Sequence, residues 1–207
     1  MTRIKICGIT NIIDAMTAVR LGVDAIGFVF APGSRRISPD QAREISRAVL
    51  PYVCKVGVFV DEPIDAINKI SEYCELDMIQ LHGSNANVEE NLFTRSIIRT
   101  FRVDNESILD DIRKSKMKYF LLDTFDKNQA GGTGKIFNWE IACKAKEYGD
   151  IILAGGLNNE NVVEALTKVS PYAIDVSSGV EKSPGIKDHD KMTLLVNEVR
   201  NWDIQAN

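Results

Sequence analysis

Eight short apolar runs recur along this chain, at intervals that leave room for one helix between each run and the next. The runs are Ile4–Cys7, Ala25–Phe30, Lys55–Val60, Met78–Leu81, Ile97–Phe101, Tyr119–Asp123, Ile151–Ala154 and Tyr172–Val176. Their starts lie 19 to 32 residues apart. Most are continuously apolar rather than alternating, which is typical of parallel strands buried on both faces. We therefore predict eight parallel strands separated by helices.

The segments between the runs carry helix signals. Asn11 precedes apolar residues at helical spacing, and Gly22 follows them as a stop. Residues 38–41, Ser-Pro-Asp-Gln, form a capping box with proline at the first helical position, and Asp188 can cap a last helix. Further helices are expected after Asp61-Glu62-Pro63, near Ala86–Phe93, over Glu106–Lys114, over Phe137–Ala145, and after a cap at Asn158.

This alternation predicts the fold class. Eight strand–helix units within 207 residues, with no linker or low-complexity stretch, indicate a closed (β/α)8 TIM barrel, a single domain over residues 1–207. An open doubly wound sheet is the main alternative. Only one glycine, Gly8, follows the first strand where a dinucleotide-binding chain would have G-x-G-x-x-G, which weakens that form of the alternative.

Charge and composition limit the classes of binding partner that this chain can have. The net charge of -4 and the absence of a basic block argue against nucleic acid or an anionic membrane as a partner. No apolar run reaches eighteen residues and no secretory signal is apparent, so we expect a cytoplasmic protein. The cysteines at 7, 54, 74 and 143 lack C-x-x-C spacing and the chain has two histidines, so reduced thiols and no metal site are expected.

Two glycine-rich turns follow the last two predicted strands, Ala154-Gly155-Gly156 and Ser177-Ser178-Gly179. Backbone N–H groups in such turns can hold an anion, and the corresponding loops of a TIM barrel frequently bind phosphate. A lone Gly-Gly pair more often only closes a tight turn. Two such turns in consecutive units favour a phosphate site.

Cys7 ends the first strand, where barrel enzymes place catalytic groups. A buried cysteine is more often an inert small hydrophobe, but its position favours a role. Lys5 shares the inward face with Cys7 and needs a buried partner, which Asp175 on the adjacent last strand can supply. We expect the Lys5 ammonium to lower the Cys7 pKa and to suit the thiol to proton transfer.

Asp123 ends the sixth strand after four apolar residues. Burial is expected to raise its pKa and to keep the carboxyl protonated at neutral pH, as an acid catalyst requires. The loop that follows contains Gly132 and Gly134 within Gly-Gly-Thr-Gly-Lys, which suggests a mobile flap, a further anion site, or a merely flexible loop.

Other strand ends offer groups that could bind a substrate. One of Arg35 and Arg36 could hold a carboxylate by a two-pronged pair, although a surface arginine pair is more often solvated. His82 is equally a donor to substrate or a structural histidine. His189 lies between two aspartates at a helix start and is expected to be solvated.

At this point the residues show a resemblance to phosphoribosylanthranilate isomerases, single-domain barrels of tryptophan biosynthesis. The similar stretches run in order along nearly the whole chain. They are KICGIT (5–10), GFVF (27–30), SRRISP (34–39), VGVFV (56–60), QLHG (80–83), LLDT (121–124), GGTGKIFNW (131–139), AGGLNNENV (154–162) and DVSSGVEKSPGIKD (175–188).

The resemblance implies an Amadori rearrangement of N-(5-phosphoribosyl)anthranilate to 1-(2-carboxyphenylamino)-1-deoxyribulose 5-phosphate. Asp123 matches the family's general acid, Cys7 its general base, and Arg36 the arginine that binds the anthranilate carboxylate. Gly155-Gly156 and Ser178-Gly179 match the phosphate site, and the Gly132–Gly134 loop matches the loop that covers the substrate. No metal or cofactor is implied, and we expect a monomer or a homodimer.

Two departures from the family pattern stand out. Residues 34–36 read Ser-Arg-Arg where the family often has Ser-Pro-Arg, so the loop is expected to be less rigid and Arg35 to compete as a ligand. Asn138 stands where aspartate is common and should cap equally well. Another sugar-phosphate barrel enzyme and a non-catalytic phosphate-ligand binding protein remain as alternative functions.

Overall fold

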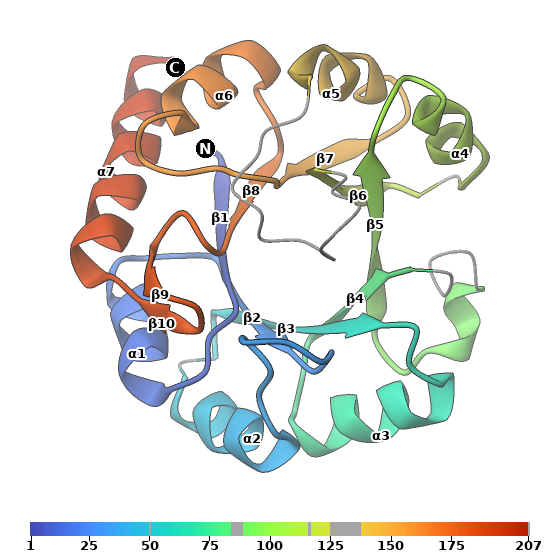
Figure 1. Ribbon diagram of the computed structural model, residues 1–207, viewed down its shortest axis with the longest axis vertical. Helices are drawn as coiled ribbons and strands as arrows, with labels where there is room; N and C mark the ends of the chain where they lie inside the picture. The colour runs from blue at the N-terminus through green and yellow to red at the C-terminus, as the bar shows by residue number, and fades with distance from the viewer. Residues whose placement is uncertain (50, 84–88, 116, 125–137, 207) are drawn as a thin grey trace.

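The computed structural model describes residues 1–49, 51–83, 89–115, 117–124 and 138–206. Eight parallel strands close into a barrel in sequence order, which excludes the open-sheet alternative (Figure 1). They are β1 (Arg3–Cys7), β2 (Ala25–Val29), β3 (Cys54–Val60), β4 (Met78–His82), β5 (Ser96–Val103), β6 (Tyr119–Thr124), β7 (Asp150–Leu153) and β8 (Ala173–Val176). All eight predicted strands are confirmed.

The helices surround the barrel on its outer face (Figure 1). They are α1 (Ile12–Arg20), α2 (Pro39–Ala48), α3 (Ile64–Tyr73), α4 (Ile108–Ser115), α5 (Trp139–Ala145), α6 (Val162–Val169) and α7 (His189–Gln205). A short hairpin of β9 (Glu181–Ser183) and β10 (Ile186–Lys187) follows β8, and it was not predicted. Among the described residues, no helix is both long and apolar enough to cross a bilayer.

The predicted caps explain where several helices begin. The Asn11 side chain accepts from the Asp14 N–H at the start of α1, and Asp188 accepts from two N–H groups at the start of α7. Ser38 and Gln41 form the full capping box of α2. Each cap satisfies N–H groups that have no partner within the helix, which fixes the first residue of the helix.

Two helix predictions need correction. Where an α-helix was expected near Ala86–Phe93, the described part of that segment holds only the 3-10 helix η2 (Glu90–Leu92). Asn158 is not the cap of α6, because its side chain accepts from the Glu160 N–H in a local turn. The cap position falls to Asn161, whose side chain instead bonds Asn158 N and Gly156 O. Asn161 thereby braces the glycine turn that precedes it.

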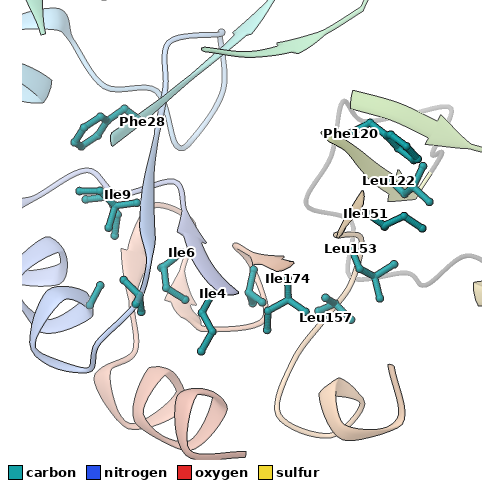
Figure 2. Packing of buried hydrophobic residues seen from close by; sticks show 14 of the residues in the cluster. Ile4, Ile6, Ile9, Phe28, Phe120, Leu122, Ile151, Leu153, Leu157 and Ile174 are labelled. Atoms are coloured by element: carbon teal, nitrogen blue, oxygen red, sulfur yellow. The ribbon is translucent and has the colours of Figure 1, made fainter. Parts of the chain in front are cut away.

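The core has two layers, because side chains alternate along each strand. One layer fills the space between sheet and helices and includes Ile4, Ile6, Phe120 and Leu122 (Figure 2). The other lies inside the barrel and is made of Val56, Ile98, Leu121, Ile152, Ala154 and Ala173. On β1 the alternation turns Lys5 and Cys7 inward, so polar groups stand above the inner apolar layer at the carboxyl end of the barrel.

Candidate active site

A cavity of about 380 Å³ opens at the carboxyl end of the strands. It brings together seven of the residues predicted for the site, from five different strands or the loops that follow them. These are Cys7, His82, Asp123, Gly155, Gly156, Asp175 and Ser178. Its lining also includes Ser177, from the second glycine-rich turn, and Gln80, to which no role was assigned from the sequence. A single cavity therefore holds the expected acid, the expected base and most of the expected phosphate turns.

The Lys5–Asp175 ion pair expected from the sequence is present. The Lys5 ammonium lies 2.9 Å from Asp175 Oδ1, and the two residues are register partners across β1 and β8. Burial alone lowers the pKa of Lys5, but the Asp175 carboxylate outweighs it and raises the pKa to about 12. The barrel interior therefore holds a permanent cation directly beneath Cys7.

Cys7 is a buried free thiol beside this cation. A Cβ placed on Gly27, its register partner on β2, would lie 2.8 Å from the sulfur and 3.1 Å from Lys5 Nζ. The glycine leaves the room that both side chains occupy. The expected fall in the Cys7 pKa is wrong, however. Burial raises the pKa of the thiol, and the attraction of Lys5 and Lys187 for the thiolate only partly offsets it.

Asp123 lies inside the same cavity at the end of β6. Its Oδ1 accepts a 2.8 Å hydrogen bond from the Thr124 backbone N–H. Burial raises the pKa of the carboxyl to about 6, although the Thr124 bond opposes the shift. The direction is as predicted, but the expected full protonation at neutral pH is wrong, because a pKa of about 6 leaves roughly a tenth of the carboxyl protonated at pH 7.

The two glycine turns lie side by side. Gly155 and Gly156 both have positive φ, +83° and +72°, which only glycine adopts readily. A bridge joins Asn158 to Gly179, and a Cβ on Gly179 would stand 2.0 Å from the Leu157 carbonyl oxygen. Neither Gly155 nor Gly156 donates its backbone N–H to another described residue. Two N–H groups of the first turn are therefore available to an anion.

The neighbouring side chains of Arg35 and Arg36 have different surroundings. Arg35 lines the cavity, and its Nε and Nη2 donate to Glu181 at 2.9 and 2.8 Å, so the expectation that it competes as a ligand stays a prediction. Arg36 is exposed at the rim and its backbone forms a bridge with Val29. Its side chain is not among those that line the cavity within the described residues. Glu181 lies in the unpredicted hairpin, and no role was assigned to it from the sequence, although it falls within the similar stretch 175–188.

His82 and Gln80 form a pair inside the barrel, with His82 Nε2 and Gln80 Nε2 2.9 Å apart. Burial, together with Arg102 and Lys5, lowers the pKa of His82 to about 3. The ring is therefore neutral at physiological pH, and it can accept from the Gln80 amide. Their spacing of two on one strand was the available signal for Gln80. His189 is exposed to solvent, as expected, and its Nε2 lies 2.8 Å from Asp14 Oδ1.

Some predicted features fall outside this site. Gly132 and Gly134, with the loop that contains them, lie outside the described residues. Gly179 supports the turn without lining the cavity in the described part of the chain. All four cysteines are free thiols, as expected. Among the described residues, no group of three or more histidine, cysteine or acidic side chains could hold a metal ion.

Comparisons with known proteins agree with this geometry. Residues 4–198 match a family described as N-(5'phosphoribosyl)anthranilate (PRA) isomerase. The N-(5'-phosphoribosyl)anthranilate isomerase of Geotalea daltonii is 45% identical over 97% of both chains. A crystal structure of phosphoribosyl anthranilate isomerase from Thermotoga maritima is 40% identical, with a TM-score of 0.89 over 97% of this chain and 100% of that one.

A further solved structure contains a ligand. It is a phosphoribosyl anthranilate isomerase in complex with reduced 1-(o-carboxyphenylamino)-1-deoxyribulose 5-phosphate. That protein is 38% identical, with a TM-score of 0.86, over 97% of this chain and 100% of that one.

Proposed function

This chain belongs to the N-(5'-phosphoribosyl)anthranilate isomerase family, and we propose that it acts by general acid–base catalysis with Asp123 as the acid and Cys7 as the base. It is an isomerase of tryptophan biosynthesis that converts N-(5'-phosphoribosyl)anthranilate to 1-(2-carboxyphenylamino)-1-deoxyribulose 5-phosphate. The observation that carries the proposed mechanism is that Asp123 and Cys7 line one cavity beside the two glycine turns.

The reaction requires two proton transfers at different atoms of the substrate. Protonated Asp123 donates to the ribose ring oxygen, the C1'–O bond breaks, and the anthranilate nitrogen supplies the electrons of the resulting Schiff base. The Cys7 thiolate then removes the proton from C2', and the electrons of that C–H bond form an enolamine. Tautomerisation of the enolamine gives the ketone, which leaves the amino sugar rearranged without net oxidation.

The buried ion pair supports the base. A thiolate at Cys7 is costly in a buried site, and the Lys5 ammonium offsets part of that cost where the charge develops. Asp175 keeps Lys5 in place, 2.9 Å away. We assign Lys5 and Asp175 supporting roles, since they act through Cys7 rather than on the substrate.

The remaining site residues are assigned to substrate binding. The available N–H groups of Gly155 and Gly156, together with the adjacent Ser178-Gly179 turn, suit the phosphate. Arg36, in the loop after β2, suits the anthranilate carboxylate. Neutral His82 suits a hydroxyl of the ribose, because its Nδ1, which has no partner among the described residues, can donate while Nε2 accepts from Gln80. We place Gly132 and Gly134 in the loop that covers the bound substrate.

The expectations about context stay predictions. They are a cytoplasmic location, no cofactor, no nucleic-acid or membrane partner, and a monomer or a homodimer. Light scattering of the purified protein decides between the two assembly states.

A fluorescence assay tests the function. N-(5'-phosphoribosyl)anthranilate is generated in situ, the purified protein is added, and the anthranilate-type fluorescence is followed. We expect the fluorescence to decay with enzyme concentration. A folded protein that binds inorganic phosphate but leaves the signal constant would favour one of the alternatives, a different sugar-phosphate enzyme or a non-catalytic binding protein.

A further inference from the structure

One buried carboxylate outside the catalytic pair connects two loops at the barrel mouth. Glu181 begins β9, in the hairpin after β8. Its side chain is 5% exposed and accepts from Arg35 Nη2 at 2.8 Å and from Lys187 Nζ at 2.9 Å. Arg35 belongs to the loop after β2, whereas Lys187 belongs to the hairpin itself. Glu181 therefore holds two cations that arrive from different loops.

Arg35 fixes the loop that carries Arg36. Its guanidinium donates through Nε as well as Nη2 to Glu181, a forked arrangement that sets the side-chain direction. A Cβ placed on Gly8 would stand 2.9 Å from Arg35 Cδ, so the stem of Arg35 lies against the backbone next to Cys7. Arg36 is the next residue, and its backbone bridges to Val29. The position of Arg36 is thus fixed from both sides.

Lys187 holds Ser177, the first residue of the Ser177-Ser178-Gly179 turn. Its side chain is fully buried, and its ammonium donates to the Ser177 carbonyl oxygen at 3.2 Å as well as to Glu181. A buried ammonium requires such partners, because burial without them is costly. Ser177 is therefore held to Glu181 through one side chain.

We propose that Glu181 is a positioning residue that fixes the separation between Arg36 and the Ser178-Gly179 turn, the groups for the two ends of the substrate. This inference rests on the proposed roles of Arg36 and of the turn. A carboxylate and a phosphate stand at opposite ends of one small molecule, so both groups must be set at a matching distance. Through its bonds to Glu181, Arg35 positions the loop that carries Arg36, at the carboxylate end of the substrate. Lys187, bonded to the same carboxylate, positions the turn at the phosphate end.

Two substitutions test the carboxylate end and the phosphate end of the site independently. Arg35→Met and Lys187→Met each leave Glu181 with its other cation, so neither variant buries a carboxylate without a cation. Inhibition constants are measured for anthranilate, which probes the carboxylate end, and for inorganic phosphate, which probes the turn. Arg47→Met is the control, because Arg47 forms an exposed pair with Glu75.

We expect Arg35→Met to weaken anthranilate binding about tenfold and to leave phosphate binding within about twofold. Lys187→Met should do the reverse, and Arg35→Lys should recover part of the anthranilate affinity because it keeps one charged donor. The kcat of Arg35→Met should change much less than its KM, since the lost contact acts on binding.

Two results would overturn the inference, and they are distinguishable. If both ligands inhibit the wild type but each variant weakens both equally or neither, Glu181 does not position the two ends, while the binding roles stand. If neither ligand inhibits the wild type, the roles of Arg36 and the turn fail, and the inference falls with them.

Discussion

The Lys5 ammonium and the Asp175 carboxylate lie 2.9 Å apart at the seam where β1 meets β8 and closes the barrel. Their side chains are only 5% and 8% exposed. Because the two residues are register partners on the first and last strands, the pair forms only when the whole barrel has closed. The pair therefore bears on catalysis as well as on folding, because the same ammonium faces the Cys7 thiol.

Breaking this pair should destabilise the protein. Asp175→Asn leaves a buried ammonium without its counter-charge, so we expect the free energy of unfolding to fall by about 3–5 kcal/mol in urea denaturation. Glu75→Gln is the matched control, because it removes the carboxylate of the exposed Arg47–Glu75 pair and should cost about 1 kcal/mol or less. Equal losses in the two variants would mean that burial does not set the strength of the Lys5–Asp175 pair.

Asp123 should have the opposite effect on stability. Its folded pKa of about 6 exceeds the unfolded value of about 3.9, so the folded state pays for ionising this carboxyl as pH rises between them. Asp123→Asn keeps an oxygen for the Thr124 N–H. The variant should gain about 2–3 kcal/mol of unfolding free energy at pH 7, and little below pH 4. A gain that is equal at both pH values would exclude ionisation as its cause.

The chain organisation could be predicted because it depends on local and periodic signals. The apolar runs, the Asn11 and Asp188 caps, and the Ser38 capping box each act within a few residues, and each appears in the structure where expected. The prediction that Asn158 caps α6 shows what such local signals cannot decide. Two asparagines near one helix start can both cap, and only the three-dimensional turn shows that Asn161 occupies the cap position.

The pH dependence of kcat/KM should reflect the ionisation of both Asp123 and Cys7, whose pKa values are raised by burial. The active form has Asp123 protonated and Cys7 ionised, although the Cys7 pKa lies above that of Asp123. Below pH 6 the rate should fall as thiolate becomes scarce, and above the Cys7 pKa it should fall as the acid is lost. Between the two, these changes cancel, so kcat/KM should be flat. A profile that peaks sharply between pH 3 and 5 would contradict these protonation states.

Gly155 should tolerate no side chain. Its φ is +83°, and a Cβ would stand 2.3 Å from Thr124 Oγ1 and 2.6 Å from the Thr124 backbone nitrogen. Gly155→Ala should therefore weaken phosphate binding and cost more stability than Gly22→Ala. Gly22 has a similar φ of +77° but nothing within 4 Å, so it isolates the backbone strain of about 1–2 kcal/mol. Thermal unfolding and phosphate titration give the comparison, and equal losses would mean that contact with Thr124 does not matter.

The site itself was only partly predictable. Strand alternation placed Lys5, Cys7 and Asp175 together, because that rule is geometric. The Cys7 pKa was predicted in the wrong direction, since a sequence shows the neighbouring charge but not the depth of burial that opposes it. Glu181 falls within the similar stretch 175–188, but no role was assigned to it from the sequence. Its partner Lys187 lies six residues away in the same hairpin, whereas Arg35 lies 146 residues away in the chain, and only the folded structure brings both to one carboxylate.

The most direct test of the proposed mechanism is the turnover of Cys7→Ser, measured by loss of substrate fluorescence with product affinity titrated on the same sample. Serine keeps the size of the side chain but is a far weaker base at neutral pH. We predict that kcat falls by about 10²–10⁴ while product affinity stays within about threefold. A kcat within tenfold of the wild type, or a loss of affinity that matches the loss of rate, would contradict the assignment of Cys7 as the general base.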